Sequence, residues 1–145
     1  MPPRDTVITI FKTYKNEIQS GNFEGVFHAA AQWNCRHIAV TWFLDSIGFE
    51  ETLKGLGTIE NSLFFGQDLP EHVVLPDNIK TIGDKAFAFT EIETLKIPES
   101  VESIGQGLFQ GCQFIKKIEL PQKLFKYRDS MLKGCNSDDI EINFY

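Results

Sequence analysis

The second half of the chain repeats one pattern of apolar and polar positions every 22 to 23 residues. Each repeat opens with an apolar-x-apolar triplet followed at once by proline, at Pro76, Pro98 and Pro121, which are 22 and 23 residues apart. Such a triplet places two side chains on one face of a short strand, and proline ends the strand because it cannot donate a ladder hydrogen bond. The pattern therefore predicts coils whose triplets stack into a small parallel sheet.

Each predicted coil returns through a second apolar segment. Ile82 and Ile104 are expected to point into the core from this segment. The residues that follow them, Gly83 and Gly105, are expected to form a turn whose backbone angles suit glycine.

Large aromatic residues are expected to fill the side of the core opposite the triplets. Phe87 and Phe109 are 22 residues apart, as the repeat requires. Ile59 and Phe64 precede Ile82 and Phe87 by 23 residues each, which predicts one earlier coil.

The pattern also continues to the end of the chain. Leu132 follows Phe109 by 23 residues, and Ile140–Ile142 repeats the triplet, which predicts a fourth strand. Phe144 and Tyr145 are expected to cover the exposed end of the core, since terminal repeats must cap it.

Two segments of this repeat, residues 79–87 and 95–105, read Ile-Lys-Thr-Ile-Gly-Asp-Lys-Ala-Phe and Leu-Lys-Ile-Pro-Glu-Ser-Val-Glu-Ser-Ile-Gly. They resemble BspA-type leucine-rich repeats, and the resemblance covers residues 56–145. It implies a right-handed solenoid used as a binding platform, in a family that includes surface proteins of bacteria and protists and short intracellular or phage-encoded proteins, with no shared chemistry. The third coil departs from the pattern at Tyr127 and Arg128, so we expect a remodelled turn there.

Residues 5 to about 56 follow helical spacing instead. Three apolar stripes predict three helices: Val7, Phe11, Tyr14 and Ile18; Phe23, Val26, Phe27 and Ala30; and Ile38, Ala39, Trp42, Phe43 and Ile47. We expect Asp5 or Thr6 to cap the first helix and Gly48 to end the third. The spacing is also similar to one ankyrin helix pair, with no second copy following. The predicted fold is α+β, with a helical N-terminal cap (1–56) and a short leucine-rich-repeat-like solenoid with a small parallel sheet (57–145), packed as one unit.

Charge and composition narrow the choice of partners. The 145 residues carry a formal net charge of −6, and Lys116-Lys117 is the only adjacent basic pair. Nucleic acids and anionic membranes attract basic patches, so we expect the chain to bind neither. No stretch approaches the ~20 apolar residues of a membrane span, and the start of the chain shows no secretory leader. Because the three cysteines do not suggest a secreted disulfide framework either, we expect a cytoplasmic protein.

Residues with reactive side chains form no recognisable catalytic or metal set. Cys112 and Cys135 occupy equivalent places in successive coils, and we expect small buried thiols there rather than a disulfide. The remaining candidates match no metal-ligand spacing: Cys35, His28, His37 and the acidic pairs Glu50-Glu51 and Asp138-Asp139. We therefore predict no metal, no cofactor and no enzymatic activity.

The strand face that points away from the core is the candidate binding surface, because a concave solenoid face presents many side chains in a regular array. Its outward positions are His72, Val74, Thr94, Lys96, Lys117, Glu119, Asp139, Glu141 and Asn143. The face grades from neutral through basic to acidic, with Val74 as a candidate anchor. An ordinary solvated sheet would show the same mixture of charges, so both interpretations stay open.

These features predict a non-enzymatic protein–protein interaction module, with a protein partner and, as a further option, self-association. The alternative is a phage-encoded inhibitor of a host defence protein or nuclease, of the anti-CRISPR kind, that binds a basic surface. Small size, net acidity and the kinship of the repeat favour this alternative. It predicts tight binding to one basic target and loss of that target's activity.

Overall fold

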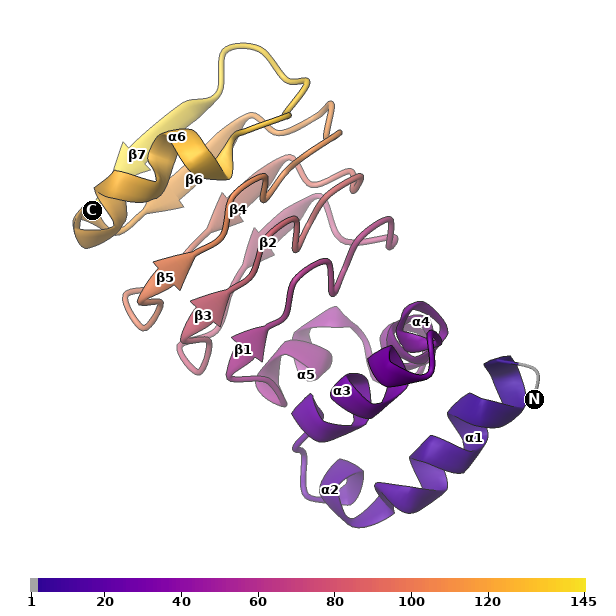
Figure 1. The fold of residues 1–145 in the computed structure, drawn as a ribbon. Coiled ribbons are helices and arrows are strands. Elements are labelled where there is room, and N and C mark those ends of the chain that lie inside the picture. Colours follow the sequence, from indigo (N-terminus) through magenta and orange to yellow (C-terminus); the bar gives the residue numbers. More distant parts are fainter. Residues whose placement is uncertain (1–2) are drawn as a thin grey trace. The chain divides into compact units, whose positions relative to one another are not determined.

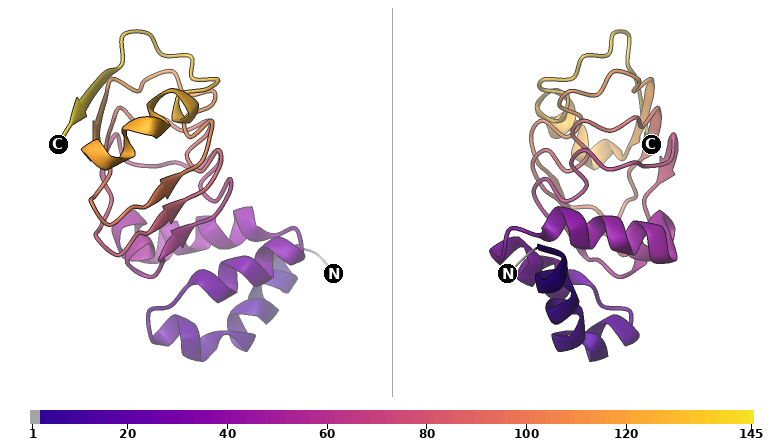
Figure 2. Two further views of the ribbon diagram at one scale, coloured as in Figure 1. Left: turned by 60° about the vertical axis from the view of Figure 1, so that its left-hand side comes forward. Right: turned by 90° about the vertical axis from the view of Figure 1, so that its right-hand side faces the viewer.

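The computed structural model describes residues 3–145, and the chain divides into two compact units between Gly57 and Thr58. The first unit is helical and the second contains the strands (Figure 1; further views in Figure 2). The helical unit contains α1 (Pro3–Thr13), α2 (Lys15–Gln19), α3 (Glu24–Gln32), α4 (Arg36–Ile47) and α5 (Phe49–Lys54).

Aromatic rings hold the helical unit together. The ring centroid of Phe43 lies 4.8 Å from that of Phe23, 4.9 Å from that of Phe27 and 5.5 Å from that of Phe11. Ring contacts of this kind add roughly 0.5–1.5 kcal/mol each beyond the burial of the rings. Phe23 also rests on the backbone at Gly55, where an added Cβ would come within 2.1 Å of its ring. The apolar stripes of α3 and α4 therefore meet in one aromatic cluster.

The first helix differs from its prediction at both ends. It begins at Pro3 rather than after a cap at Asp5 or Thr6, and it is interrupted at Tyr14, where φ is −99° and ψ is 22°. Tyr14 N still donates to Ile10 O at 2.9 Å, so the interruption is a kink within a hydrogen-bonded path. The predicted stripe is consequently divided between α1 and α2.

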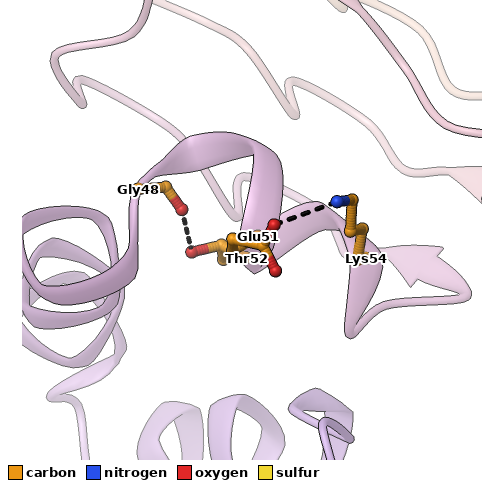
Figure 3. Close-up of polar contacts among 4 residues, drawn as sticks. All are labelled: Gly48, Glu51, Thr52 and Lys54. Carbon is orange, nitrogen blue, oxygen red and sulfur yellow. Dashed lines mark hydrogen bonds and ion pairs between the residues drawn. The ribbon is translucent and has the colours of Figure 1, made fainter.

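Gly48 ends α4 as predicted, with φ at +87°, but α5 follows it at once and was not predicted. Thr52 Oγ1 donates to the Gly48 carbonyl at 2.8 Å, and Lys54 Nζ lies 2.9 Å from Glu51 Oε1 (Figure 3). Glu50 and Glu51 are both exposed, as expected for a solvated acidic pair.

The repeat unit forms two parallel sheets with the strand orders β1-β3-β5 and β2-β4-β6-β7 (Figure 1). Its elements are β1 (Thr58–Ile59), β2 (His72–Val74), β3 (Thr81–Ile82), β4 (Thr94–Lys96), β5 (Ser103–Ile104), β6 (Lys117–Leu120), the 3-10 helix η1 (Gln122–Tyr127), α6 (Arg128–Met131) and β7 (Glu141–Phe144). The second sheet contains the four predicted strands. The first sheet was not predicted, and it forms where the returning segments stack. The result is a leucine-rich-repeat-type fold with helices and two small parallel sheets.

Phenylalanine rings form a continuous column through this core. The rings of Phe64 and Phe87 stack with centroids 5.8 Å apart and an interplanar angle of 4°, and those of Phe87 and Phe109 with centroids 6.3 Å apart and an angle of 20°. All three side chains are fully buried. Together with the pairing of β1 and β3, this column confirms the earlier coil. Leu132, expected next in the column, is only half-buried.

Glycine is required at Gly83 and Gly105 for a different reason from the predicted turn angles. Neither has a positive φ. An added Cβ would lie 2.5 Å from Asn61 N at Gly83 and 2.3 Å from Asp84 N at Gly105. Asn61 Oδ1 in turn accepts a hydrogen bond from Asp84 N at 2.8 Å, and Asp84 Oδ1 accepts one from Gln106 N at 2.9 Å. Neighbouring coils approach so closely here that only glycine fits.

The last strand is displaced by two residues from its prediction. Ile142 pairs with Ile118, so the inward triplet is 142–144 rather than 140–142. Asp139, with φ at +56°, lies in the turn before β7, and its predicted place on the sheet is wrong. The shift arises because η1 and α6 advance only about 1.5–2.0 Å per residue, against about 3.3 Å for a strand. The coil therefore needs more residues to return.

The remodelled turn predicted for the third coil is confirmed. η1 ends at Tyr127 and α6 begins at Arg128, so helical turns follow where a further strand beside β5 would begin. The guanidinium carbon of Arg128 lies 4.0 Å from the ring centroid of Phe125, and that ring lies 5.1 Å from the ring of Phe144.

Candidate functional site

The structure places eight of the nine predicted surface residues on the outward face of the four-stranded sheet. We call this set the outward sheet face: His72, Val74, Thr94, Lys96, Lys117, Glu119, Glu141 and Asn143. Strand register arranges them in two rows, His72-Thr94-Lys117-Glu141 and Val74-Lys96-Glu119-Asn143. The side chains between them on β2, β4 and β6 are buried, so the alternation of each strand separates core from surface.

Two shallow hollows on this face share Val74 and Lys96. One lies over β2, β4 and β6, and the other extends past Pro76 and Pro98 to Tyr145. Val74 is 69% exposed, and its neighbour in register on β4 is Lys96. Lys96 Nζ lies 5.3 Å from the ring centroid of Tyr145, so the ring restricts the position of this ammonium group.

Hydrogen bonds fix the rim of the face. His72 Nδ1 and Thr94 Oγ1 are 2.9 Å apart across β2 and β4. Just before β4 and β6, the side chains of Glu93 and Lys116 form an ion pair. The hydrogen bond between them lowers the pKa of Glu93 and raises the pKa of Lys116, so both groups stay charged across the neutral range.

Carboxylates gather around Tyr145 at the far end of the face. The hydroxyl of Tyr145 donates to the carbonyl of Ile97. Partial burial raises the pKa of Tyr145, and the nearby charges of Glu99, Glu119 and Asp77 raise it further. The same carboxylates create a negative potential that would attract a cationic group from a partner.

A second exposed feature, at Phe89, was missed in the sequence. Phe89 has φ at +56°, and the residues at the same position in the other coils are Gly66, Gly111 and Gly134, with φ at +68°, +73° and +77°. A left-handed conformation costs an L-amino acid roughly 1–2 kcal/mol. Aligning the four coils would have shown this replacement of glycine by a bulky residue.

The ring of Phe89 is nevertheless half in solvent. It is 52% exposed, and its centroid lies 5.1 Å from that of Phe65, which is 41% exposed. It covers Gly111, where a Cβ would lie 2.4 Å from the ring. Phe65 and Phe89 thus form an exposed aromatic pair on the repeat unit.

We expect Phe89→Gly to change the free energy of unfolding by less than about 1 kcal/mol, because relief of backbone strain offsets the lost ring contacts. Urea denaturation followed by circular dichroism measures this change. A loss as large as that of a core phenylalanine would contradict the assignment of strain at this position.

The cysteines are free thiols. Cys112 is buried, its Sγ donates to the carbonyl of Phe87 at 3.3 Å, and burial raises its pKa, so the expected buried thiol is confirmed there. Cys135 is only half-buried, with its Sγ 3.7 Å from the carbonyl oxygen of Cys112. Within residues 3–145, no three His, Cys, Asp or Glu side chains gather closely enough to hold a metal ion. In that same range, no helix has the length and apolar character needed to cross a bilayer.

The repeats match a known protein family. The family described as "BspA type Leucine rich repeat region (6 copies)" matches residues 40–144. A crystal structure of a leucine-rich repeat protein from Bacteroides ovatus ATCC 8483 is 24% identical with a TM-score of 0.40, over 63% of this chain and 29% of that chain. This chain therefore aligns with less than a third of that protein's length. No curated protein matches the sequence. Because the family match covers most of its length, the chain belongs to the BspA-type leucine-rich repeat family.

Proposed function

We propose that the protein is a non-enzymatic interaction module that binds a protein partner through the outward sheet face. The observation that carries this proposal is a hollow on the face that exposed Val74 lines together with the charged side chains of Lys96, Lys117 and Glu119. Leucine-rich repeats are generally protein–protein interaction modules, which supports the same role.

The ladder beneath the face makes it suitable for binding. Main-chain pairing fixes β2, β4 and β6 in register, so their outward side chains are held at strand spacing. A surface that is ordered before binding loses little conformational entropy when a partner arrives. Val74 supplies apolar contact at the β2 edge of the face, and Lys96, Lys117 and Glu119 supply polar contacts on β4 and β6.

Alanine substitution of Lys96, Lys117 and Glu119 together is expected to weaken partner binding at least tenfold, since truncated interface residues commonly cost about 1–2 kcal/mol each when they anchor a contact. The free energy of unfolding should change by less than about 0.5 kcal/mol per residue, because the side chains are outside the core. Affinity capture from the cell that makes the protein identifies the partner. Calorimetric titration of the purified partner then measures its affinity for the unmodified protein and for the triple variant.

The matched control is alanine at Lys80 and Glu102, which are exposed near the other sheet. This control should leave the affinity unchanged. If the triple variant binds as tightly as the unmodified protein, the outward sheet face is not the contact surface.

A second role is favoured by the carboxylates around Tyr145 and by the net charge of −6. Both suit a partner with a basic surface, and a phage-encoded inhibitor of a host defence nuclease would meet such a surface. This role predicts that adding the protein abolishes the activity of one basic nuclease.

We also propose that the coils act as a solenoid platform with residues 1–56 as its cap. On that view, removal of these residues should lower the solubility and the melting temperature of the remainder.

A further inference from the structure

The core of the repeat unit is incompletely covered at its last coil. Ile118 and Leu120 on β6 are fully buried, because the next strand lies beside them. Their partners in register, Ile142 and Phe144, are only half-buried. β7 is the final strand of its sheet, and Figure 1 shows it at the end of the row of arrows.

Within residues 3–145, the main chain of β7 has one edge that no other strand covers. Glu141 N donates to Lys116 O at 2.8 Å, and Tyr145 N donates to Leu120 O at 3.1 Å. Alternate residues of a parallel strand bond to the same neighbour, so the N–H and C=O groups of Ile142 and Phe144 point away from β6. Unpaired edges are commonly protected by lysine, proline or a bulge. β7 contains neither lysine nor proline, and its one charged side chain, Glu141, is at its first residue.

We propose that β7 pairs antiparallel with β7 of a second copy of the chain, about a twofold axis at Asn143. In this register, the main chain of Ile142 exchanges hydrogen bonds with that of the partner's Phe144, and the symmetry repeats the exchange. The N–H and C=O groups of Ile142 and Phe144 that point away from β6 are then all paired on both strands. The two four-stranded sheets join into one sheet with both outward faces on the same side.

The side chains of β7 suit this pairing. On the core side, Ile142 lies opposite the partner's Phe144, a β-branched residue against an aromatic one, which is a favourable cross-strand pair. On the outward side, Asn143 meets the partner's Asn143 at the axis. Glu141 lies opposite the partner's Tyr145. Like charges face each other nowhere along the strand.

The charges that flank β7 select the antiparallel direction. Asp138 and Asp139 precede the strand. At its other end, Gln122 N donates to Tyr145 O at 2.7 Å, which places the start of η1, with Lys123, beside the end of the strand. An antiparallel pair places the acidic ends of the two strands at opposite ends of the ladder, away from each other. A parallel pair would align the two acidic ends, and repulsion would oppose it.

Light scattering coupled to size-exclusion chromatography of the full chain tests the proposal. The unmodified protein should approach twice the monomer mass of 16.5 kDa as its concentration rises into the high micromolar range. Asn143→Asp and Asn143→Lys each place like charges at the axis, and each should raise the dimer dissociation constant roughly fivefold or more, equivalent to about 1 kcal/mol. An equimolar mixture of the two variants should form a heterodimer tighter than either homodimer. Asn143→Ser serves as the uncharged control and should still form dimers.

Two results would overturn the proposal. The first is an unmodified protein that stays monomeric, or forms only larger assemblies, at every concentration. The second is dimerisation that the Asn143→Lys change leaves intact, which would place the contact elsewhere or in another register. Asn143 is exposed, so circular dichroism of each variant should match that of the unmodified protein. This test does not depend on the identity of any other partner, so its outcome is separate from that of the proposed function.

Discussion

Gly105→Ala is expected to destabilise the repeat unit by about 2–3 kcal/mol, because overpacking a close contact typically costs 1–3 kcal/mol. The added methyl group would lie 2.3 Å from Asp84 N and 2.5 Å from the carbonyl carbon of Gly83, both in the preceding coil. These are backbone atoms, so no rotamer change can relieve the clash. Gly105 N also donates to Ile82 O at 2.8 Å, and the coils must separate at this bond to admit the methyl group.

Hydrogen exchange of the β3 and β5 amides is the suitable measurement for this variant. Trp33 and Trp42 both lie in the helical unit, so tryptophan fluorescence would not report on the coils. Gly107→Ala is the matched control. Its φ is +63° and its nearest neighbours are 3.6 Å away, so it should cost only about 1–2 kcal/mol of backbone strain. Equal protection in Gly105→Ala and the unmodified protein would show that the coils are not packed as closely as described.

Phe87→Ala is expected to cost about 3–5 kcal/mol, the usual range for removing a fully buried aromatic side chain. Phe87 is the central ring of its column, with Phe64 on one side and Phe109 on the other. Its removal would leave a cavity that the neighbouring coils cannot close, because strand pairing fixes the spacing between coils. Chemical denaturation followed by circular dichroism measures the loss.

The control for this substitution is Phe114→Ala, which removes the same ring from a position that is 51% exposed. It should change the free energy of unfolding by about 0.5 kcal/mol or less. If Phe87→Ala and Phe114→Ala lowered the free energy of unfolding by similar amounts, the stacked phenylalanine rings would not be a main source of the stability of the repeat unit.

Sequence reasoning succeeded where one residue type serves one purpose in every coil. The register of β2, β4 and β6 followed from the proline after each triplet, and the buried column followed from the spacing of Phe87 and Phe109. In both cases, residues that are one repeat apart in the sequence lie next to each other in adjacent coils. The sites on the outward sheet face followed from the same alternation, since every second residue of a strand points outward.

Sequence reasoning failed where the role or placement of a residue depends on contacts between coils. The close approach of Gly83 to Asn61 N depends on how tightly two coils stack, which a single coil does not encode. The two-residue shift of β7 depends on how many residues η1 and α6 use, and helical turns in that coil were not predicted. Asp139 was misplaced for the same reason. Phe89 was overlooked because bulky residues are not expected at positive φ.

The measurement that tests the central claim most directly is site-specific photo-cross-linking in extract of the cell that makes the protein. One variant carries a photoreactive amino acid in place of Lys96 on the outward sheet face. A second variant carries it in place of Glu102, which is exposed near the other sheet. We predict one dominant cross-linked protein from position 96, absent when Lys117 and Glu119 are also changed to alanine, and no such product from position 102. Equal products from both positions, or a product from position 96 that survives the two alanines, would contradict the account.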